Sequence, residues 1–161
     1  KNTVDQWTKV HSSAHEIGFM TTATMMYGHI EKPQHVIETL SHIRTVQDES
    51  EKKLGSFTAF IPWSYKKEHN ALSKKVSIEA GPNQYLRIIA LSRIFLDNIP
   101  HIQASWFSEG KKTGQVALKF GADDFGGSLF DEKKFVIVNR ATDKLFGLID
   151  DISKKNMKLN F

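Results

Sequence analysis

The stretch TTATMMYGHIE, residues 21–31, begins as a run of Thr and Met with the two-residue alternation of a buried β-strand. Side chains two positions apart lie on the same face of a strand. One face therefore carries Thr22, Thr24, Met26 and Gly28, and the opposite face carries the residues between them. The sequence predicts a strand over residues 21–28.

This strand is followed by a glycine and polar residues that lead into a helix. Gly28 allows the backbone to turn or to approach a ligand closely, and Pro33 lies near the first position of the next helix. Such a sequence is typical of a βα loop. In α/β folds the loops at the carboxyl ends of strands carry the chemistry.

Helices and strands alternate on both sides of this loop. Apolar residues spaced three and four apart predict the helices, and short apolar runs predict the strands. The expected helices cover residues 3–17, 33–49, 81–97 and 111–120. The expected strands cover residues 21–28, 57–63 and 101–107, followed by a strand or turn at 121–128.

The alternation indicates an α/β fold with about four parallel strands joined by right-handed crossovers. From this order alone, the strands form either an open sheet or half of a β/α barrel. Residues 135–138 are a possible further strand. A C-terminal helical segment is expected from Thr142 onward, because apolar residues recur on one helical face after this capping residue.

The composition is that of an ordinary globular domain. The 161 residues are 40% hydrophobic and 25% charged, and 22 basic against 18 acidic residues give a net charge of +4. No apolar run approaches the roughly 18 residues of a membrane helix, and scattered lysine pairs without an arginine–aromatic array argue against nucleic acid. The chain has no Cys, which excludes a thiolate metal site within it and favours a cytoplasmic location.

Several separate stretches carry a family resemblance. They are TTATMMYGHIE, IRTVQDES, FTAFIPW, LRIIALSRIFLDNIPHIQASW and GQVALKFGADDFGGS, within roughly residues 5–130. Together, and in this order, they resemble the C-terminal half of radical S-adenosylmethionine enzymes of the futalosine route to menaquinone. FTAFIPW, NIPHIQASW and GADDFGG are most similar to the cyclase of that route, which acts on dehypoxanthine futalosine.

The resemblance implies a TIM-type β/α barrel. In this family an N-terminal CxxxCxxC loop holds an iron–sulfur cluster, which cleaves S-adenosylmethionine to a 5′-deoxyadenosyl radical. Since this chain has no Cys and begins at Lys1, we expect it to be the C-terminal half of such a barrel, without the cluster ligands. Residues 1–130 would form the half-barrel, and residues 131–161 an extension to which the resemblance assigns no role.

The family's strand motif GxIxGxxE is matched by Thr24-x-Met26-x-Gly28-x-x-Glu31, with Thr in place of the first Gly. The resemblance implies that Met26 packs on the adenine of S-adenosylmethionine, that Gly28 allows close approach and that Glu31 caps the following helix. On the residues alone, a core Met and a helix-start Glu favoured by the helix dipole explain the same motif.

Two residues at the end of the next expected strand complete the expected cofactor-binding set. Ile61 and Trp63 lie in FTAFIPW, and Trp63 either stacks on adenine or an aromatic substrate group or packs in the core.

The resemblance also implies a nucleoside substrate, whose expected binding residues are Thr22, Thr24, His29, Gln103, Ser105 and Asp123. Gln103 and Ser105 share one face of the expected strand, where polar side chains need partners such as substrate ribose or ordered water. His29 either bonds a substrate hydroxyl or faces solvent. One of the two residues Asp123 and Asp124 either holds a sugar hydroxyl or caps the glycine-rich turn. The sequence identifies no catalytic residue.

A second histidine pattern lies in the first expected helix. His11 and His15 have the i, i+4 spacing of a helical metal-binding pair. Without a third ligand, surface histidines are the better interpretation, so no metal site is predicted.

Three functions remain open on the sequence. The first is the substrate-side half of the radical cyclase of menaquinone biosynthesis, inactive when isolated. The second is a sister radical enzyme of the aminofutalosine or deazaflavin synthase type. The third is a non-catalytic half-barrel fragment. Because four strands cannot close a barrel and unpaired strand edges recruit partners, we expect pairing with a missing N-terminal half or with a second copy.

Overall fold

The computed structural model describes residues 3–67, 71–76 and 79–126. The elements follow the expected alternation, and they are α1 (Val4–Glu16), β1 (Thr21–Tyr27), α2 (Pro33–Ser50), β2 (Phe57–Ser64), η1 (Ala71–Lys74), α3 (Pro82–Phe95), β3 (His101–Ile102), α4 (Trp106–Glu109) and α5 (Lys111–Ala117). The expected strand at 135–138, the expected C-terminal helix and the boundary at residue 130 lie outside the described residues.

Local signals explain where the helices begin and end. Thr3 and Gln6 form a capping box at the start of α1, in which each side chain accepts a hydrogen bond from the other residue's backbone N–H. Gly18, with φ +92°, follows the end of this helix. Pro33 and Pro82 open α2 and α3 at positions where a helix needs no backbone donor.

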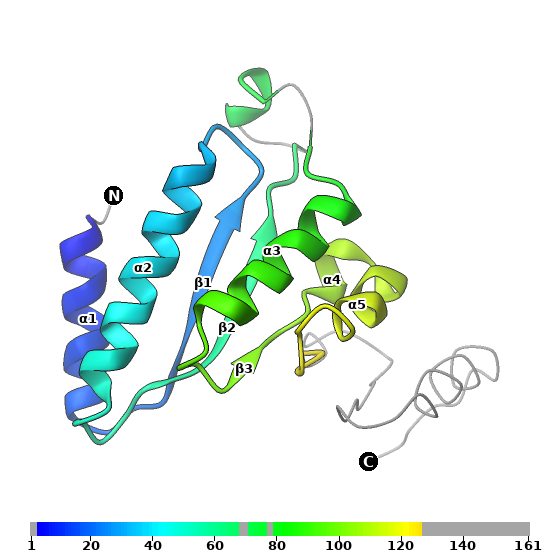
Figure 1. Ribbon diagram of the computed structural model, residues 1–161. Coiled ribbons are helices and arrows are strands. Elements are labelled where there is room, and N and C mark those ends of the chain that lie inside the picture. Colours follow the sequence, from blue (N-terminus) through cyan, green and yellow to red (C-terminus); the bar gives the residue numbers. More distant parts are fainter. Residues whose placement is uncertain (1–2, 68–70, 77–78, 127–161) are drawn as a thin grey trace, which may run out of the picture.

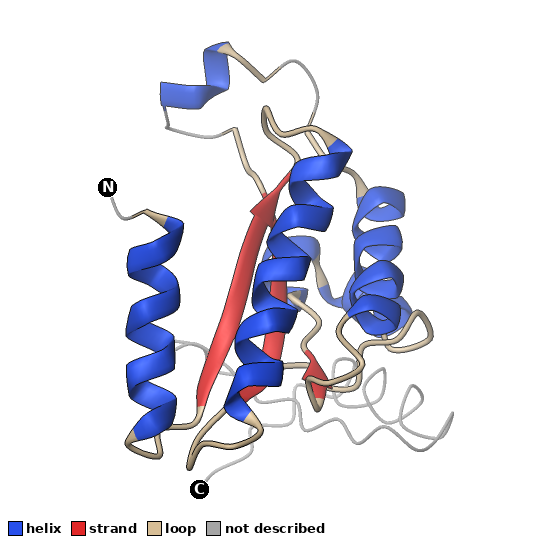
Figure 2. Ribbon diagram, turned by 60° about the vertical axis from the view of Figure 1, so that its left-hand side comes forward, coloured by secondary structure: helices blue, strands red, loops and turns tan. Residues whose placement is uncertain are grey.

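The three strands form one parallel sheet in the order β1-β2-β3. The helices α2 and α3 lie over the same face of this sheet, and α1 lies beside β1 (Figure 1). The turned view in Figure 2 shows the strands behind these helices. The described residues thus confirm the α/β class and the parallel strands, as a small open sheet.

The third strand is shorter than expected. Backbone pairing ends with Ile102 and one isolated parallel bridge between Gln103 and Asp124, so the expected strand over 101–107 is wrong beyond this point. Ser105 turns the chain away from the sheet, since its N–H donates to the Tyr85 hydroxyl at 2.7 Å and Trp106 then starts α4. The expected fourth strand is represented in the described residues by that single bridge.

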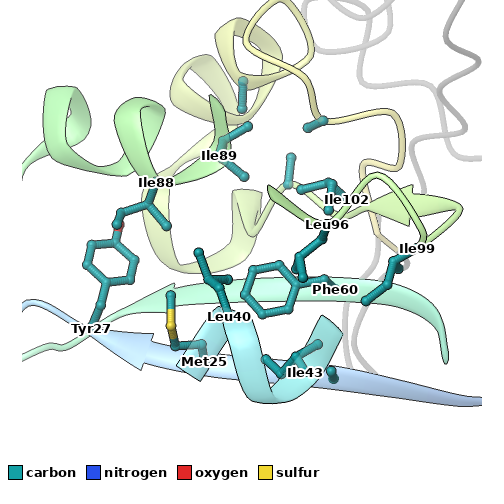
Figure 3. Packing of buried hydrophobic residues seen from close by; sticks show 14 of the residues in the cluster. Met25, Tyr27, Leu40, Ile43, Phe60, Ile88, Ile89, Leu96, Ile99 and Ile102 are labelled. Carbon is teal, nitrogen blue, oxygen red and sulfur yellow. The ribbon is translucent and has the colours of Figure 1, made fainter. Parts of the chain in front are cut away.

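The hydrophobic core lies between the sheet and the helices α2 and α3 (Figure 3). Alternate residues of β1, namely Ala23, Met25 and Tyr27, point into it and are at most 6% exposed. Phe60 of β2 is fully buried beside them. Burying such side chains is the main source of stability in a domain of this size.

The opposite face of β1 is open. Thr22, Thr24 and Met26 are exposed there, and they alternate along the strand with the buried core residues. The alternation expected from TTATMMYGHIE is therefore confirmed. None of the helices in the described residues is long and apolar enough to cross a membrane.

Candidate functional site

The carboxyl ends of β1 and β2 present two large apolar side chains on the open face. Met26 and Trp63 are register partners on these neighbouring strands. Each is 52% exposed, and two adjacent exposed apolar side chains of this size are an informative feature of a surface. Trp63 therefore does not pack in the core of the described chain, and it offers a flat aromatic surface beside a thioether.

Gly28 forms the turn that follows β1. Its φ of +83° lies in the left-handed region, and a Cβ there would come within 2.6 Å of the Ala80 Cβ. The close neighbour that requires glycine is thus this chain's own residue, from the segment just before α3. The turn expected at this position is confirmed, and the close approach of a ligand to Gly28 stays a prediction.

Glu31 closes this turn. Its carboxylate accepts hydrogen bonds from the backbone N–H groups of Gly28 at 2.5 Å and His29 at 2.8 Å. Burial alone would raise the pKa of Glu31, but these backbone hydrogen bonds outweigh it and hold the pKa below its usual value. The side chain points back to the loop after β1, so the expectation that it caps the following helix is wrong.

At the start of α2, the capping hydrogen bond is accepted by His35 and not by Glu31. His35 Nδ1 accepts from the N–H of Lys32 at 3.2 Å, which is the reach-back half of a capping arrangement. Glu31 is consequently available for the turn that precedes the helix.

His29 lies half-buried in the same turn. Its Nδ1 accepts from the N–H of Ile30 at 2.7 Å and lies 3.1 Å from Glu31 Oε2. Its ring meets that of Tyr65 edge to face, with centroids 6.2 Å apart. The ring is thus oriented by protein contacts, and His29 as a substrate-binding residue stays a prediction.

A pocket of about 410 Å³ lies beside these strand ends, between β2 and the segment that follows β3. Its apolar walls include Ile61, Trp63, Phe107 and Phe125. Its polar lining residues are Ser64, Lys66, Gln103, Ser105 and Ser108. Apolar walls with a few placed polar groups are typical of small-molecule sites.

Two of the expected substrate-binding residues meet in this pocket. Gln103 Nε2 donates to Asp124 Oδ2 at 2.8 Å. Ser105 is buried, and its hydroxyl donates to the carbonyl oxygen of Pro62 at 2.9 Å. The protein itself supplies the partners that the sequence analysis assigned to ribose or water.

The two adjacent aspartates have different surroundings. Asp123 is held by Arg93, whose Nη2 lies 2.7 Å from Oδ1, and by the N–H of Ile102 at 2.9 Å. Its side chain is 5% exposed. Asp124 instead contacts Gln103 and accepts from the N–H of Gly126 at 2.8 Å, which caps the glycine-rich turn. Asp124 is the carboxylate next to the pocket.

Neither of the two expected threonines lies at this end of the sheet. Thr22 precedes Met26 by four residues, which corresponds to about 13 Å along a strand. Thr24 pairs with Ile61 in the middle of the sheet, and it also lines a groove between α1 and α2. Neither lines the pocket beside Trp63.

The paired histidines of α1 have a structural role. His15 is fully buried, and its ring nitrogens contact Ser50 Oγ at 2.7 Å and Thr21 Oγ1 at 2.8 Å. Burial, followed by the charges of His11 and Lys53, lowers the pKa of His15. The interpretation of both residues as surface histidines is wrong, because Phe57 packs against their rings. In the described part of the chain, no three His, Cys, Asp or Glu side chains are grouped to hold a metal ion.

Glu109 is a residue that the sequence analysis missed. Its side chain is 3% exposed, and it accepts hydrogen bonds from Ser64 and from Lys66, the latter at 3.5 Å. It thereby joins the end of β2 to α4 behind the pocket. No spacing or motif distinguishes this glutamate from a surface residue, so the sequence carried no signal for it.

A comparison with known protein families matches most of the residues around the pocket. The family model described as "CofH/MqnC C-terminal region" matches residues 54–151. The chain belongs to this family. The match includes β2, the pocket beside it and the Gln103–Asp124 pair.

Curated relatives match a larger share of the chain than the family model does. The chain is 42% identical over 132 residues, 82% of its length, to a cyclic dehypoxanthine futalosine synthase of Streptomyces coelicolor. It is 35% identical over 162 residues, covering 95% of the chain, to an aminodeoxyfutalosine synthase of the same organism. It is 42% identical over 130 residues, 79% of the chain, to a 5-amino-6-(D-ribitylamino)uracil–L-tyrosine 4-hydroxyphenyl transferase of Methanococcus maripaludis.

These comparisons confirm the resemblance found in the sequence. The chain spans 32%, 39% and 35% of the length of these three relatives, respectively. The family is one of synthases and transferases. The roles of the individual site residues stay predictions.

Proposed function

We propose that this chain is the substrate-side, C-terminal part of a radical S-adenosylmethionine enzyme that cyclises dehypoxanthine futalosine in menaquinone biosynthesis. The observation that carries the proposal is the exposed pair Met26 and Trp63 beside a pocket at the carboxyl ends of parallel strands. Active sites of β/α folds lie at these strand ends. The 42% identity to a cyclic dehypoxanthine futalosine synthase supports the choice of reaction.

The open face fits the adenosyl part of S-adenosylmethionine. Met26 and Trp63 offer adjacent apolar surfaces for a planar base, and Ile61 lies on the same strand two residues before Trp63. The backbone N–H groups of Gly28 and His29 are already bonded to Glu31. In this proposal, Glu31 would therefore act by shaping the turn after β1. When bound and reduced, S-adenosylmethionine supplies the hydrogen-abstracting chemistry of the enzyme.

An iron–sulfur cluster does not fit this chain. Such clusters are held by Cys thiolates, and the sequence contains no Cys. The cluster ligands of the complete enzyme would lie in another part of the protein. We expect the isolated chain neither to bind a cluster nor to cleave S-adenosylmethionine.

The pocket between β2 and α4 would hold the substrate. Its aromatic walls suit a planar ring, while Gln103 and Ser105 provide polar groups for sugar hydroxyls. In this proposal, these groups orient the substrate. Positioning of this kind supplies much of the rate enhancement in enzymes.

A second candidate is a sister reaction of the same family. The identity to the 4-hydroxyphenyl transferase is also 42%, over a stretch of nearly equal length. The aminodeoxyfutalosine synthase covers more of the chain at lower identity. The choice among these reactions depends on the substrate that the pocket accepts.

Within the described residues, β1 pairs with a strand on one side, β2, and its other face is open. We propose that the N-terminal part of the same protein completes the barrel, with a second copy of the chain as the alternative. Exposed strand edges and apolar faces favour such pairing. Size-exclusion chromatography with light scattering tests this, because a well-folded monomer of the isolated chain that melts cooperatively would contradict it.

The reaction is tested with the full-length, cluster-loaded protein under anaerobic conditions. Dehypoxanthine futalosine is compared with the substrates of the two sister reactions, and products are identified by mass spectrometry. The proposal predicts a cyclic product and turnover only with dehypoxanthine futalosine. Turnover with tyrosine and the ribitylaminouracil instead would establish the transferase, and turnover with none would reject all three reactions.

A further inference from the structure

We propose that Asp124 fixes the orientation of the Gln103 side-chain amide, so that Gln103 presents its carbonyl oxygen to the pocket and selects a ligand group that donates a hydrogen bond. This inference rests on the proposed function only in taking the pocket as a ligand site. It assigns a positioning role to Asp124 and a specificity role to Gln103.

The first step is the chemistry of the pair. An ionised carboxylate can only accept hydrogen bonds, whereas an amide has a donating and an accepting end. Gln103 Nε2 lies 2.8 Å from Asp124 Oδ2. The amide nitrogen must therefore face Asp124, and the carbonyl oxygen Oε1 diverges from it. Without a carboxylate neighbour, the two ends of an amide would be interchangeable.

The second step is that Asp124 is itself fixed. Its Oδ1 accepts from the N–H of Gly126 at 2.8 Å, and its backbone forms the isolated bridge with Gln103. The N–H of Ala104 also donates to the carbonyl oxygen of Asp124 at 2.7 Å. The Asp124 side chain is thus held by a backbone N–H, and the backbones of both residues are held by the bridge and by Ala104.

The third step is the space around the amide. Gly126 has φ +80°, and a Cβ there would lie 3.2 Å from Gln103 Cδ and 3.3 Å from Nε2. A glycine at this position leaves room for the amide in the orientation that Asp124 demands. The atoms nearest to Gly126 do not include Oε1, which agrees with the oxygen lying away from the turn.

The fourth step concerns the other polar groups of the pocket. The hydroxyl of Ser105 donates to Pro62 O, and that of Ser64 donates to Glu109. These groups direct their protons into the protein. Gln103 Oε1 accepts no hydrogen bond from the described residues, so it offers an acceptor to a ligand hydroxyl or N–H.

The test uses a matched pair of aromatic probes that differ in one donor. The pocket of about 410 Å³ has aromatic walls, so 4-fluorophenol and 4-fluoroanisole are suitable, and binding to the full-length protein is followed by ¹⁹F NMR. We expect the phenol to bind about tenfold more tightly, because a hydrogen bond to a prepared acceptor discriminates by roughly this factor. If the unmodified protein binds both probes equally, or binds neither, the inference is overturned.

Variants then separate the two roles. Gln103→Leu should abolish the preference for the phenol. Asp124→Asn should reduce the ratio of phenol to anisole affinity to near one while the anisole still binds. The Gln103 amide can then flip, so that its nitrogen faces the pocket as readily as its oxygen. A merely structural role for Asp124 would weaken both probes equally, and circular dichroism identifies a variant that fails to fold.

The outcome is independent of the proposed reaction. If the phenol preference depends on Asp124 but the protein shows no radical activity, the inference stands and the proposed function fails. If the enzyme cyclises its substrate but the probes are not discriminated, the proposed function stands and this inference fails.

Discussion

Met25 and Met26 are consecutive in the sequence but lie on opposite faces of β1, with exposed fractions of 6% and 52%. Met25 packs in the core under α2 and α3, as Figure 3 shows. Met26 pairs in register with Trp63 on the open face. One residue position thus separates a side chain that stabilises the fold from one that is free to contact a ligand.

This relationship predicts opposite effects for two alanine substitutions in the full-length protein. Met25→Ala should lower the free energy of unfolding by about 3 kcal/mol, because it leaves a cavity in the core. Met26→Ala should change stability little but weaken S-adenosylmethionine binding several-fold. Urea unfolding and isothermal titration calorimetry measure the two effects. If the folded Met25→Ala and Met26→Ala variants bind S-adenosylmethionine with equal affinity, the assignment of the ligand face is wrong.

A second prediction concerns Glu31 and acid. Because the backbone hydrogen bonds from Gly28 and His29 hold its pKa below the usual value, folding is stabilised above the unfolded pKa of about 4.5. This contribution is lost as the pH falls through the lower, folded pKa. Glu31→Gln should reduce stability at pH 7 by about 1–2 kcal/mol and flatten this acid dependence.

The comparison for Glu31 is the neighbouring helix residue Glu38, an exposed side chain on α2. Glu38→Gln should leave the unfolding curve between pH 3 and pH 7 nearly unchanged. If both variants behave alike, the turn after β1 does not depend on the Glu31 carboxylate.

A third prediction concerns His15. Since burial lowers its pKa from 6.5, the unfolded state binds a proton more readily than the folded state. Stability should be complete above about pH 6.5 and should fall as the pH decreases toward the folded pKa. Denaturant unfolding between pH 7.5 and pH 5 measures this slope.

His15→Asn should make that slope smaller, although it also lowers stability at pH 7.5 because it disturbs the contacts with Ser50 and Thr21. His42→Asn, on the exposed side of α2, is a matched control that should retain the wild-type slope. An unchanged slope in the His15 variant would assign the pH dependence to another group.

A fourth prediction separates the adjacent aspartates. The Asp123 side chain is 5% exposed and pairs with Arg93. Asp123→Asn removes this charge partner and should lower the free energy of unfolding by about 3 kcal/mol. Asp124→Asn should cost about 1 kcal/mol or less, since an Asn can still accept from Gly126. Thermal unfolding of both variants decides, and the reverse order would contradict the structural role of Asp123.

The sequence predicted those features that depend on local pattern. The alternation of TTATMMY placed Met25 and Met26 on their correct faces, and proline and glycine marked most helix boundaries. The end of β3 could not be predicted, because it depends on a hydrogen bond from Ser105 to the distant Tyr85.

Other site features depend on contacts between distant segments. Asp123 and Asp124 are adjacent and of the same type in the sequence, and contacts from distant segments distinguish them, among them the ion pair between Arg93 on α3 and Asp123. The Glu109 carboxylate accepts a hydrogen bond from Ser64 on β2, a contact between distant segments that no local pattern reveals. The helix cap expected from Glu31 failed because the two N–H groups of the preceding turn compete for the same carboxylate.

The central claim is that the open face at the carboxyl ends of β1 and β2 binds S-adenosylmethionine. Hydrogen–deuterium exchange of the full-length protein, with and without S-adenosylmethionine, measures this most directly. The account predicts slower exchange in residues 24–31 and 61–66 and no change in residues 51–56, at the opposite end of the sheet. Protection at 51–56, or no protection in either stretch under saturating S-adenosylmethionine, would contradict it.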